Sequence, residues 1–296
     1  MPFLGELSAL LTAMLWSGSA MIFTAATKRV GSFQVNITRL ILAVLYLTLV
    51  IIVFPFSKNI SSSQIVNLGI SGIIGLALGD TFLFKAFQEI GARISMLIMS
   101  LAPAITALLA YIFLDEKISM IGVVGIIITI SGVSLVVFEK GASASEKLVL
   151  TTAGIFYALL GAIGQGVGLI FAKMAFNESE INGFVAADIR IIASIVLLLP
   201  LAIMTKRFKS PIRMYNDDKK AFYLTAVGSV FGPFLGISFS LIAVEYTDVG
   251  VAATIMATVP ILMLPLVKFI YKETLSWRAI MGAFIAVGGV ALLFLR

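Results

Sequence analysis

The 296-residue sequence contains no cysteine and no histidine, and only 12% of its residues are charged. Without cysteine, the chain has no disulfide, no thiolate nucleophile and no cysteine-based metal site. Without histidine, it lacks the side chain that most often carries protons near neutral pH, so proton transfer would have to use carboxylates, lysine or tyrosine. Carboxylates at metal-ligand spacing are absent from the sequence as well. We therefore expect neither an enzyme nor a bound metal or cofactor.

Long hydrophilic stretches are also scarce, and the longest, residues 205–220, is too short to form a domain. In contrast, 60% of the residues are hydrophobic and the mean hydropathy is +1.11, which is typical of a membrane protein. A spanning helix needs about 20 apolar residues, and the polar clusters delimit ten such stretches. The expected spans are 4–25, 34–54, 64–86, 93–114, 119–138, 149–171, 183–204, 221–243, 248–270 and 275–295.

The stretch from Gly79 to Phe138 occurs twice, because it aligns without a gap on Gly236 to Leu295 when it is shifted by 157 positions. Fourteen of the 60 aligned residues are identical, and a proline, a loop glutamate and two glycines recur in the same order. These pairs are Pro103/Pro260, Glu116/Glu273, Gly125/Gly282 and Gly132/Gly289. The repeat predicts two five-helix halves, residues 1–140 and 149–296, joined by a linker at 141–148.

The odd number of spans in each half means that the two halves cross the membrane in opposite directions. The loop charges agree, since 15 of the 21 Lys and Arg residues fall on one face of the ten-span topology. The positive-inside rule places that face and the linker in the cytoplasm and both termini outside. Inverted repeats are common in secondary transporters, whose substrate site lies near the bilayer midplane between the halves. We therefore expect an all-α, multi-pass protein of the cell (inner) membrane with a central cavity.

Polar residues within the predicted spans are candidates for lining that cavity. Trp16 lies deeper in span one than the interfacial position that tryptophan usually takes. The next residue, Ser17, either lines the cavity or serves close helix packing. Gln165 of span six aligns with Ser17 in the repeat. Arg39 and its counterpart Arg190 either extend to lipid phosphates or act as ion-pair or gating groups at a cavity. Asp188, two residues before Arg190, belongs to the same set.

Asp80 in span three is the most buried-looking carboxylate of the first half, and Arg39 or Lys85 is its expected partner. Its aligned residue is Ile237, so the repeat does not require an acid at this position. A functional role and a structural ion pair are both open for Asp80. The expected cavity residues are Trp16, Ser17, Asp80, Phe84, Met99, Gln165, Phe239 and Met256.

Pro103 and Pro260 predict that spans four and nine are broken near their centres, because proline removes one backbone hydrogen bond. Glu116 and Glu273, in the turns that follow these spans, are interpreted as structural residues at helix starts. Methionines beside Pro103 and Pro260 either provide an adaptable apolar surface for a ligand or fill space.

The pattern resembles the drug/metabolite transporter superfamily, EamA type, over nearly the whole chain. The resemblance is carried by Trp16-Ser17-Gly18, Arg39, Gly79 to Ala86, Pro103, Glu116, Gly125 and Gly132, with echoes at Arg190, Pro260, Glu273, Gly282 and Gly289. It implies ten helices around a central cavity lined mainly by spans one, three, four, six, eight and nine. It also implies export or exchange of small metabolites such as amino acids. The chain departs from a symmetric pattern because span six lacks the tryptophan of span one and Asp80 has no symmetric partner.

These observations favour a secondary active transporter that exports or exchanges small organic, amino-acid-like solutes by alternating access. A membrane channel is the alternative, although it needs a continuous polar lining. The expected partners are a small-molecule substrate, the lipid bilayer and, if Asp80 carries it, a coupled proton. We expect a monomer. We expect no binding of nucleic acid, because the basic residues behind the net charge of +6 lie mostly in loops, where they indicate the orientation of the chain in the membrane.

Overall fold

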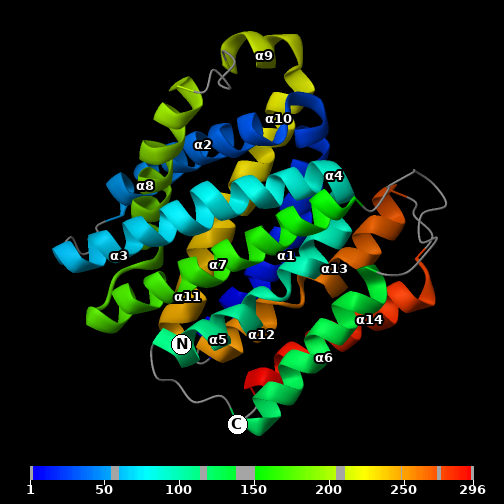
Figure 1. Cartoon of the computed structure of the whole chain (residues 1–296). Coiled ribbons are helices and arrows are strands. Elements are labelled where there is room, and N and C mark those ends of the chain that lie inside the picture. Colours follow the sequence, from blue (N-terminus) through cyan, green and yellow to red (C-terminus); the bar gives the residue numbers. More distant parts are fainter. Residues whose placement is uncertain are drawn as a thin grey trace.

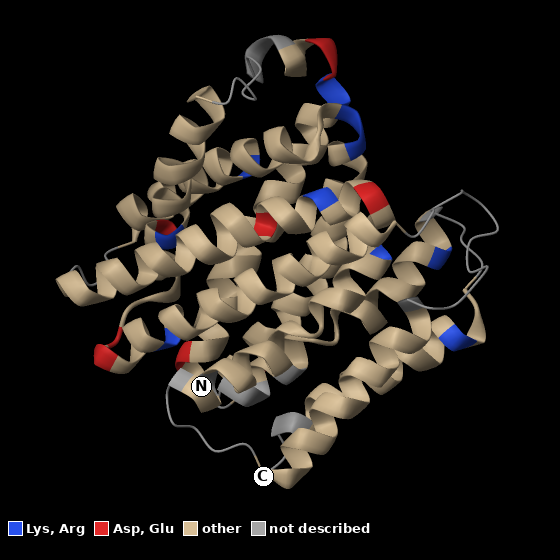
Figure 2. Ribbon diagram, in the orientation of Figure 1, with Lys and Arg blue, Asp and Glu red and all other residues tan. Residues whose placement is uncertain are grey.

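A computed structural model describes residues 3–54, 60–113, 119–137, 151–204, 211–247, 249–271 and 275–294, and in these ranges the chain is helical apart from short turns. Six helical stretches there are long and apolar enough to cross a membrane, and shorter apolar helices accompany them. Figure 2 shows charged residues mainly near helix ends, with long uncharged stretches between them. The prediction of an all-α membrane protein is confirmed.

The first half consists of α1 (Leu4–Val30), α2 (Ser32–Val53), α3 (Ser62–Gly72), the π-helical segment η1 (Ile73–Gly79), α4 (Asp80–Met99), α5 (Ala102–Phe113) and α6 (Met120–Val137). The second half consists of α7 (Thr152–Glu178), α8 (Gly183–Met204), the short α9 (Pro211–Asp217), α10 (Lys219–Ser229), the π-helical η2 (Val230–Gly236), α11 (Ile237–Tyr246), α12 (Val249–Met256), α13 (Val259–Leu266), the π-helical η3 (Val267–Tyr271) and α14 (Trp277–Phe294). The expected linker 141–148 and the residues Glu116 and Glu273 lie outside the described residues.

The structure repeats with the same 157-residue shift as the sequence. Under this shift α3 coincides with α10, η1 with η2, and α6 with α14. The earlier helices correspond as well, since α1 and α7 each have 27 residues and α2 and α8 each have 22. The α1–α2 connection is Gly31 alone, whereas residues 179–182 connect α7 to α8. The two halves therefore consist of corresponding helices in the same order, and helices of one half pack against helices of the other (Figure 1).

Spans three and four turn into each other at Gly91, whose φ of 75° lies in the left-handed region that favours glycine. Spans four and nine are each interrupted. Span four breaks between Met99 and Ala102, and span nine breaks between Met256 and Val259, so the two breaks are related by the same 157-residue shift. A proline follows each break at the second position of the next helix, as the sequence led us to expect.

Glycines on span three let it pack directly against the backbone of α7. A Cβ added to Gly164 would lie 2.7 Å from the Cα of Gly79, and one added to Gly168 would lie 3.1 Å from the Cα of Gly75. The Ser71 hydroxyl donates a hydrogen bond to the Gly168 carbonyl at 2.5 Å. The glycine-rich run in α7 is thus a close helix contact, which is the usual role of small residues between membrane helices.

The equivalent contact in the other half is filled by aromatic rings. A Cβ added to Gly236 would lie 2.6 Å from the indole Nε1 of Trp16, and one added to Gly228 would lie 2.6 Å from the ring of Phe23. Trp16 and Phe23 are seven residues apart and therefore lie on the same side of α1. The glycines of span eight thus fix where the two rings of α1 can lie.

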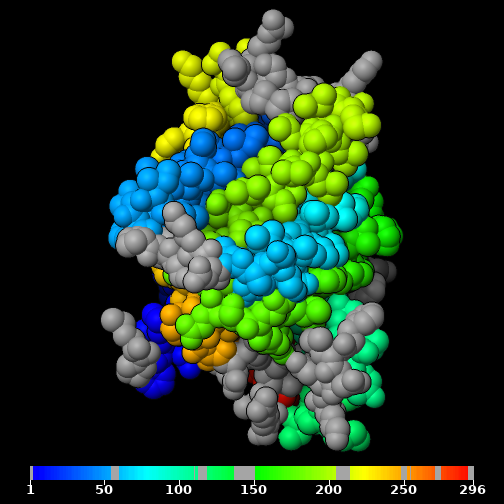
Figure 3. All heavy atoms as spheres, turned by 90° about the vertical axis from the view of Figure 1, so that its left-hand side faces the viewer, coloured from blue at the N-terminus to red at the C-terminus, as the bar shows by residue number. Residues whose placement is uncertain are grey.

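The last spans of the two halves, α6 and α14, pack side by side at the periphery (Figure 1). The contact uses the repeated glycines, since a Cβ on Gly282 would lie 2.9 Å from the Gly132 carbonyl and one on Gly289 would lie 2.7 Å from the Gly125 carbonyl. On another face, α2, α3 and α8 lie together (Figure 3). The outward side chains on α8 are large and apolar, which suits contact with lipid: Ile192, Val196, Leu197, Leu201, Ile203 and Met204.

Candidate functional site

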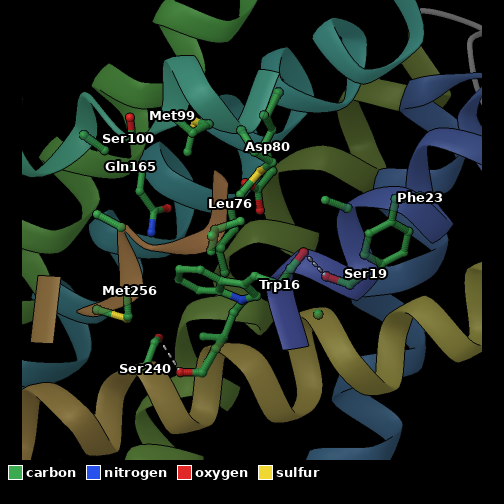
Figure 4. A pocket seen from close by; sticks show the side chains of 18 of the residues that line it. Trp16, Ser19, Phe23, Leu76, Asp80, Met99, Ser100, Gln165, Ser240 and Met256 are labelled. Atoms are coloured by element: carbon green, nitrogen blue, oxygen red, sulfur yellow. Dashed lines mark hydrogen bonds between the residues drawn. The ribbon is translucent and has the colours of Figure 1, made fainter. Parts of the chain in front are cut away.

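A cavity of about 130 Å³ lies between the two halves. Its walls come from α1, η1, α4, α5 and α7 together with η2, α11, α12 and α13, and one side chain reaches it from each of α2 and α8. Figure 4 shows Trp16 from α1 near its centre, with Gln165 and Asp80 directed toward it from different helices. The cavity also borders both helix breaks, since Ser100 and Ala257 are among its lining residues.

A buried ion pair forms the charged part of the wall. Arg39 Nη2 donates to Asp80 Oδ2, and the two side chains are only 4% and 12% exposed. Arg39 Nε donates to Asn36 Oδ1 at 2.9 Å, and Asn36 Nδ2 donates to Thr81 Oγ1 at 2.8 Å. The sequence left Arg39 or Lys85 as the partner of Asp80, and the structure selects Arg39.

Two aromatic rings cover the guanidinium of Arg39. Its Cζ lies 4.5 Å from the ring centroid of Phe84 and 5.6 Å from that of Phe23. The two rings are themselves 4.9 Å apart between centroids. A cation above an aromatic face is stabilised electrostatically, and more so when water is excluded. Arg39 is therefore held by an acid, an amide and two rings, which fixes it at the cavity wall.

Arg190 reaches the cavity from α8 and has far fewer partners. The residue is 2% exposed, and its Nε has no hydrogen-bond acceptor among the described residues. Its Nη2 lies 3.4 Å from the position that a Cβ on Gly75 would occupy, so the side chain passes over that glycine. Asp188 does not pair with it at salt-bridge distance, and Asp188 Oδ1 also lacks a partner among the described residues.

The remaining wall is mostly apolar, with Trp16, Leu76, Met99 and Met256 among its members. The serine hydroxyls on the wall donate to carbonyls of their own helices: Ser19 to Trp16, Ser100 to Leu97 and Ser240 to Ile237. In the described part of the chain we find no hydrogen bond that engages the amide of Gln165. The groups free to bind a ligand are thus chiefly the Gln165 amide and the Arg190 guanidinium.

The structure brings together most of the residues that the sequence singled out. Those that line the cavity are Trp16, Asp80, Phe84, Met99, Gln165, Met256, Arg39, Arg190, Pro103 and Pro260. Ser17 does not line it, because its hydroxyl donates to the Ala13 carbonyl at 2.6 Å and faces Val259 at 3.4 Å. Phe239 also points elsewhere and packs edge-on against Phe184, with 6.2 Å between centroids.

Lys85 and Asp188 are likewise outside the cavity lining. The Lys85 Nζ lies over the ring of Tyr157, 4.7 Å from its centroid. The structure also shows lining residues that the sequence did not predict: Phe23, Leu76, Ser19, Ser100 and Ser240. A helical projection from Trp16 would have found Phe23, whereas nothing in the sequence distinguishes the three serines from others in the spans.

Comparison with known proteins agrees with this architecture. The EamA-like transporter family matches the chain twice, at residues 3–138 and 152–295. A protein of Archaeoglobus fulgidus named as an uncharacterized transporter is 22% identical over 290 residues, covering 98% of this chain and 97% of that protein. One from Clostridium kluyveri with the same name is 26% identical over 297 residues, covering 97% and 92%.

A solved crystal structure shares the fold, with a TM-score of 0.69 and coverage of 98% of both chains at 17% identity. The two family matches divide the chain at the same place as its internal repeat. Together they span nearly all of the sequence. The chain belongs to the EamA-like transporter family, a family of membrane transporters.

Proposed function

We propose that this protein is a secondary active transporter that exports or exchanges small organic metabolites, amino-acid-like solutes foremost, by alternating access across the inner membrane. The observation that supports this most directly is the position of the cavity. It lies between two inverted halves and borders the breaks in spans four and nine. A site at such a position can be exposed to either side when the halves exchange their arrangements.

The packing suggests which parts move. Span one packs along span eight, and span six packs along span three, over most of their lengths. Polar contacts link each pair of spans near one end. Spans one and eight are joined by a salt bridge, with Arg29 Nε 2.7 Å from Asp218 Oδ2. Spans three and six are joined by hydrogen bonds that Ser61 and Ser63 donate to Glu178 at 2.9 and 2.6 Å. Arg29 and Glu178 lie at the C-terminal ends of α1 and α7. Because these helices are equivalent in inverted repeats, the two sets of contacts lie at opposite faces of the membrane.

Spans four and nine differ because each consists of short helices separated by a break at the cavity wall. The regular helical bonding is reduced at each break, because the proline that follows it has no N–H to donate and short turn bonds, such as Leu101 N to Ile98 O and Thr258 N to Ile255 O, take its place. Such a span can change the angle between its two parts more easily than a continuous helix. We therefore assign the gating motion to α5, α12 and α13. The well-packed pairs of spans one with eight and six with three serve as the frame.

The size and chemistry of the cavity fit a small organic solute. An apolar protein cavity of ~150 Å³ is known to hold benzene, so about 130 Å³ admits a body of comparable size. The indole of Trp16 and the side chains of Met99 and Met256 offer adaptable apolar contact. Few polar groups project into the space, which is the usual make-up of a small-molecule site.

The test is transport of a labelled panel of amino acids and other small metabolites in proteoliposomes, with and without an imposed pH gradient, for the wild type and Asp80→Asn. Saturable movement of an unchanged solute, accelerated by the same solute on the other side, is expected of a carrier. Movement that does not saturate and shows no such acceleration would instead identify a channel. If a pH gradient drives solute transport by the wild type but not by Asp80→Asn, the coupled proton is assigned to Asp80.

A further inference from the structure

The two halves of this protein neutralise their buried arginines differently. Arg39 and Arg190 each occupy the eighth position of their helices, α2 and α8. In the first half, Asp80 pairs with Arg39 and Asn36 accepts from its Nε. The repeat places Ile237 and Ala187 at the equivalent positions of the second half. Neither of these side chains can accept a hydrogen bond, which explains why the Nε of Arg190 lacks a partner in the described structure.

The cavity consequently carries an excess positive charge. The charged residues that line it are Arg39, Arg190 and Asp80, and the carboxylate is already engaged by Arg39. Arg190 is 2% exposed, so bulk water does little to compensate its charge. Asp80 also lies within electrostatic range of Arg190, but one carboxylate cannot neutralise two guanidinium groups, and a buried charge that is not fully compensated is unfavourable. A negatively charged ligand at this point would remove that penalty.

We propose that Arg190 binds the carboxylate of the transported solute, so that the solute provides in the second half the negative charge that Asp80 provides in the first. A planar guanidinium pairs with a carboxylate through two parallel hydrogen bonds, which orients the ligand as well as holding it. The apolar part of the solute then packs against the indole and methionine side chains at the centre of the cavity. As a statement about transport, this inference rests on the proposed function.

Two glycines of span three, Gly72 at the end of α3 and Gly75 in η1, allow Arg190 to reach this position. Any side chain at Gly72 would collide with the backbone of Arg190 itself, and a Cβ at Gly75 would lie 3.4 Å from its Nη2. The arginine therefore extends from a peripheral helix, across the backbone of span three, to the cavity. A guanidinium held along such a path has little freedom to turn away, so it is preorganised for an anion.

The experiment measures binding to the purified full-length protein in detergent by isothermal titration calorimetry. The probes are matched pairs that differ in the carboxylate: benzoate with benzamide, phenylalanine with phenylalaninamide, and leucine with leucinamide. We expect at least one carboxylate to bind and its amide to bind at least 10-fold more weakly, since a lost charge-assisted hydrogen bond changes affinity by about 10- to 100-fold. Arg190→Gln should abolish this preference.

A second pair of variants tests the idea without removing the arginine. Ile237→Asp places an internal carboxylate where the repeat positions it against Arg190, and it should weaken carboxylate binding by at least 10-fold. Ile237→Asn has a similar size and no charge, and it is the reference variant because Ile237 itself lines the cavity. The Asp variant should bind the carboxylate at least 10-fold more weakly than the Asn variant. If Arg190→Gln does not fold, this pair alone decides the question.

Three results would overturn the assignment: no carboxylate in the panel binds, the amides bind as well as the acids, or Ile237→Asp and Ile237→Asn bind the carboxylate equally well. Binding that depends on Arg190 without transport in proteoliposomes would refute the proposed function and leave the anion site standing. Transport of neutral solutes that is unaffected by Arg190→Gln would support the proposed function and refute the anion site.

Discussion

The buried pair of Arg39 and Asp80 allows a quantitative test of how charge is held inside this protein. Asp80→Asn leaves Arg39 without its counter-ion in a site where the arginine is only 4% exposed. Breaking a buried pair from one side destabilises a protein by about 3–5 kcal/mol. The bond to Asn36 and the rings of Phe23 and Phe84 remain, and desolvated cation–π contacts contribute about 2 kcal/mol. Because these contacts are present in the wild type and in the variant, they do not offset the lost ion pair, and we expect a loss of about 3–5 kcal/mol in the free energy of unfolding.

The opposite truncation should be milder. In Arg39→Gln the unpaired Asp80 still has Arg190 within electrostatic range, so part of its charge stays compensated. The double variant removes both charges and should be at least about 1 kcal/mol more stable than the sum of the two single losses implies.

The assay is reversible unfolding in mixed micelles for the wild type, the two single variants and the double variant. Additivity of the single losses to within about 0.5 kcal/mol would contradict the ion-pair reasoning. So would a greater loss for Arg39→Gln than for Asp80→Asn.

The remaining predictions concern helix packing, the helix breaks and the salt bridge between Arg29 and Asp218. Gly164→Ala should destabilise the protein by about 1–3 kcal/mol through overpacking, because its Cβ would lie 2.7 Å from the Gly79 Cα; Gly18→Ala, with nothing within 4 Å, is the control and should be neutral in the same unfolding assay. Pro103→Ala and Pro260→Ala should slow solute exchange in proteoliposomes by a larger factor than they change the dissociation constant, because both residues follow the breaks as well as line the cavity. An unchanged exchange rate would argue against gating there. The Arg29 guanidinium, with the Ala221 backbone N–H, holds the pKa of Asp218 below its ordinary value. The stabilisation by this salt bridge is therefore fully present above pH ~4. It is lost only as the pH falls through the lowered pKa. Asp218→Asn should therefore change stability equally at pH 5 and pH 8, and a pH-dependent difference between them would refute this.

The sequence by itself determined the architecture of this protein. The length of the apolar stretches predicted the spans, and the 157-residue repeat predicted which helices correspond. The structure confirms both, with η1 and η2 and the two helix breaks related by that same shift. Such features depend on local composition and on the order of glycines and prolines, which the chain carries without reference to its neighbours.

Only the tertiary structure decided which side of each helix faces the cavity. Ser17 and Ser19 are two residues apart, which is more than half a helical turn, so packing of α1 directs one into a neighbour and the other to the cavity. Phe239 follows the π-helical η2, whose extra residue per turn rotates the later side chains relative to an ideal helix. Contacts between spans also decided that Arg39 pairs with Asp80 and that the Nε of Arg190 has no acceptor among the described residues. Helix rotation and ion pairing are set by neighbours that lie far away in the sequence, and the folded arrangement alone brings them together.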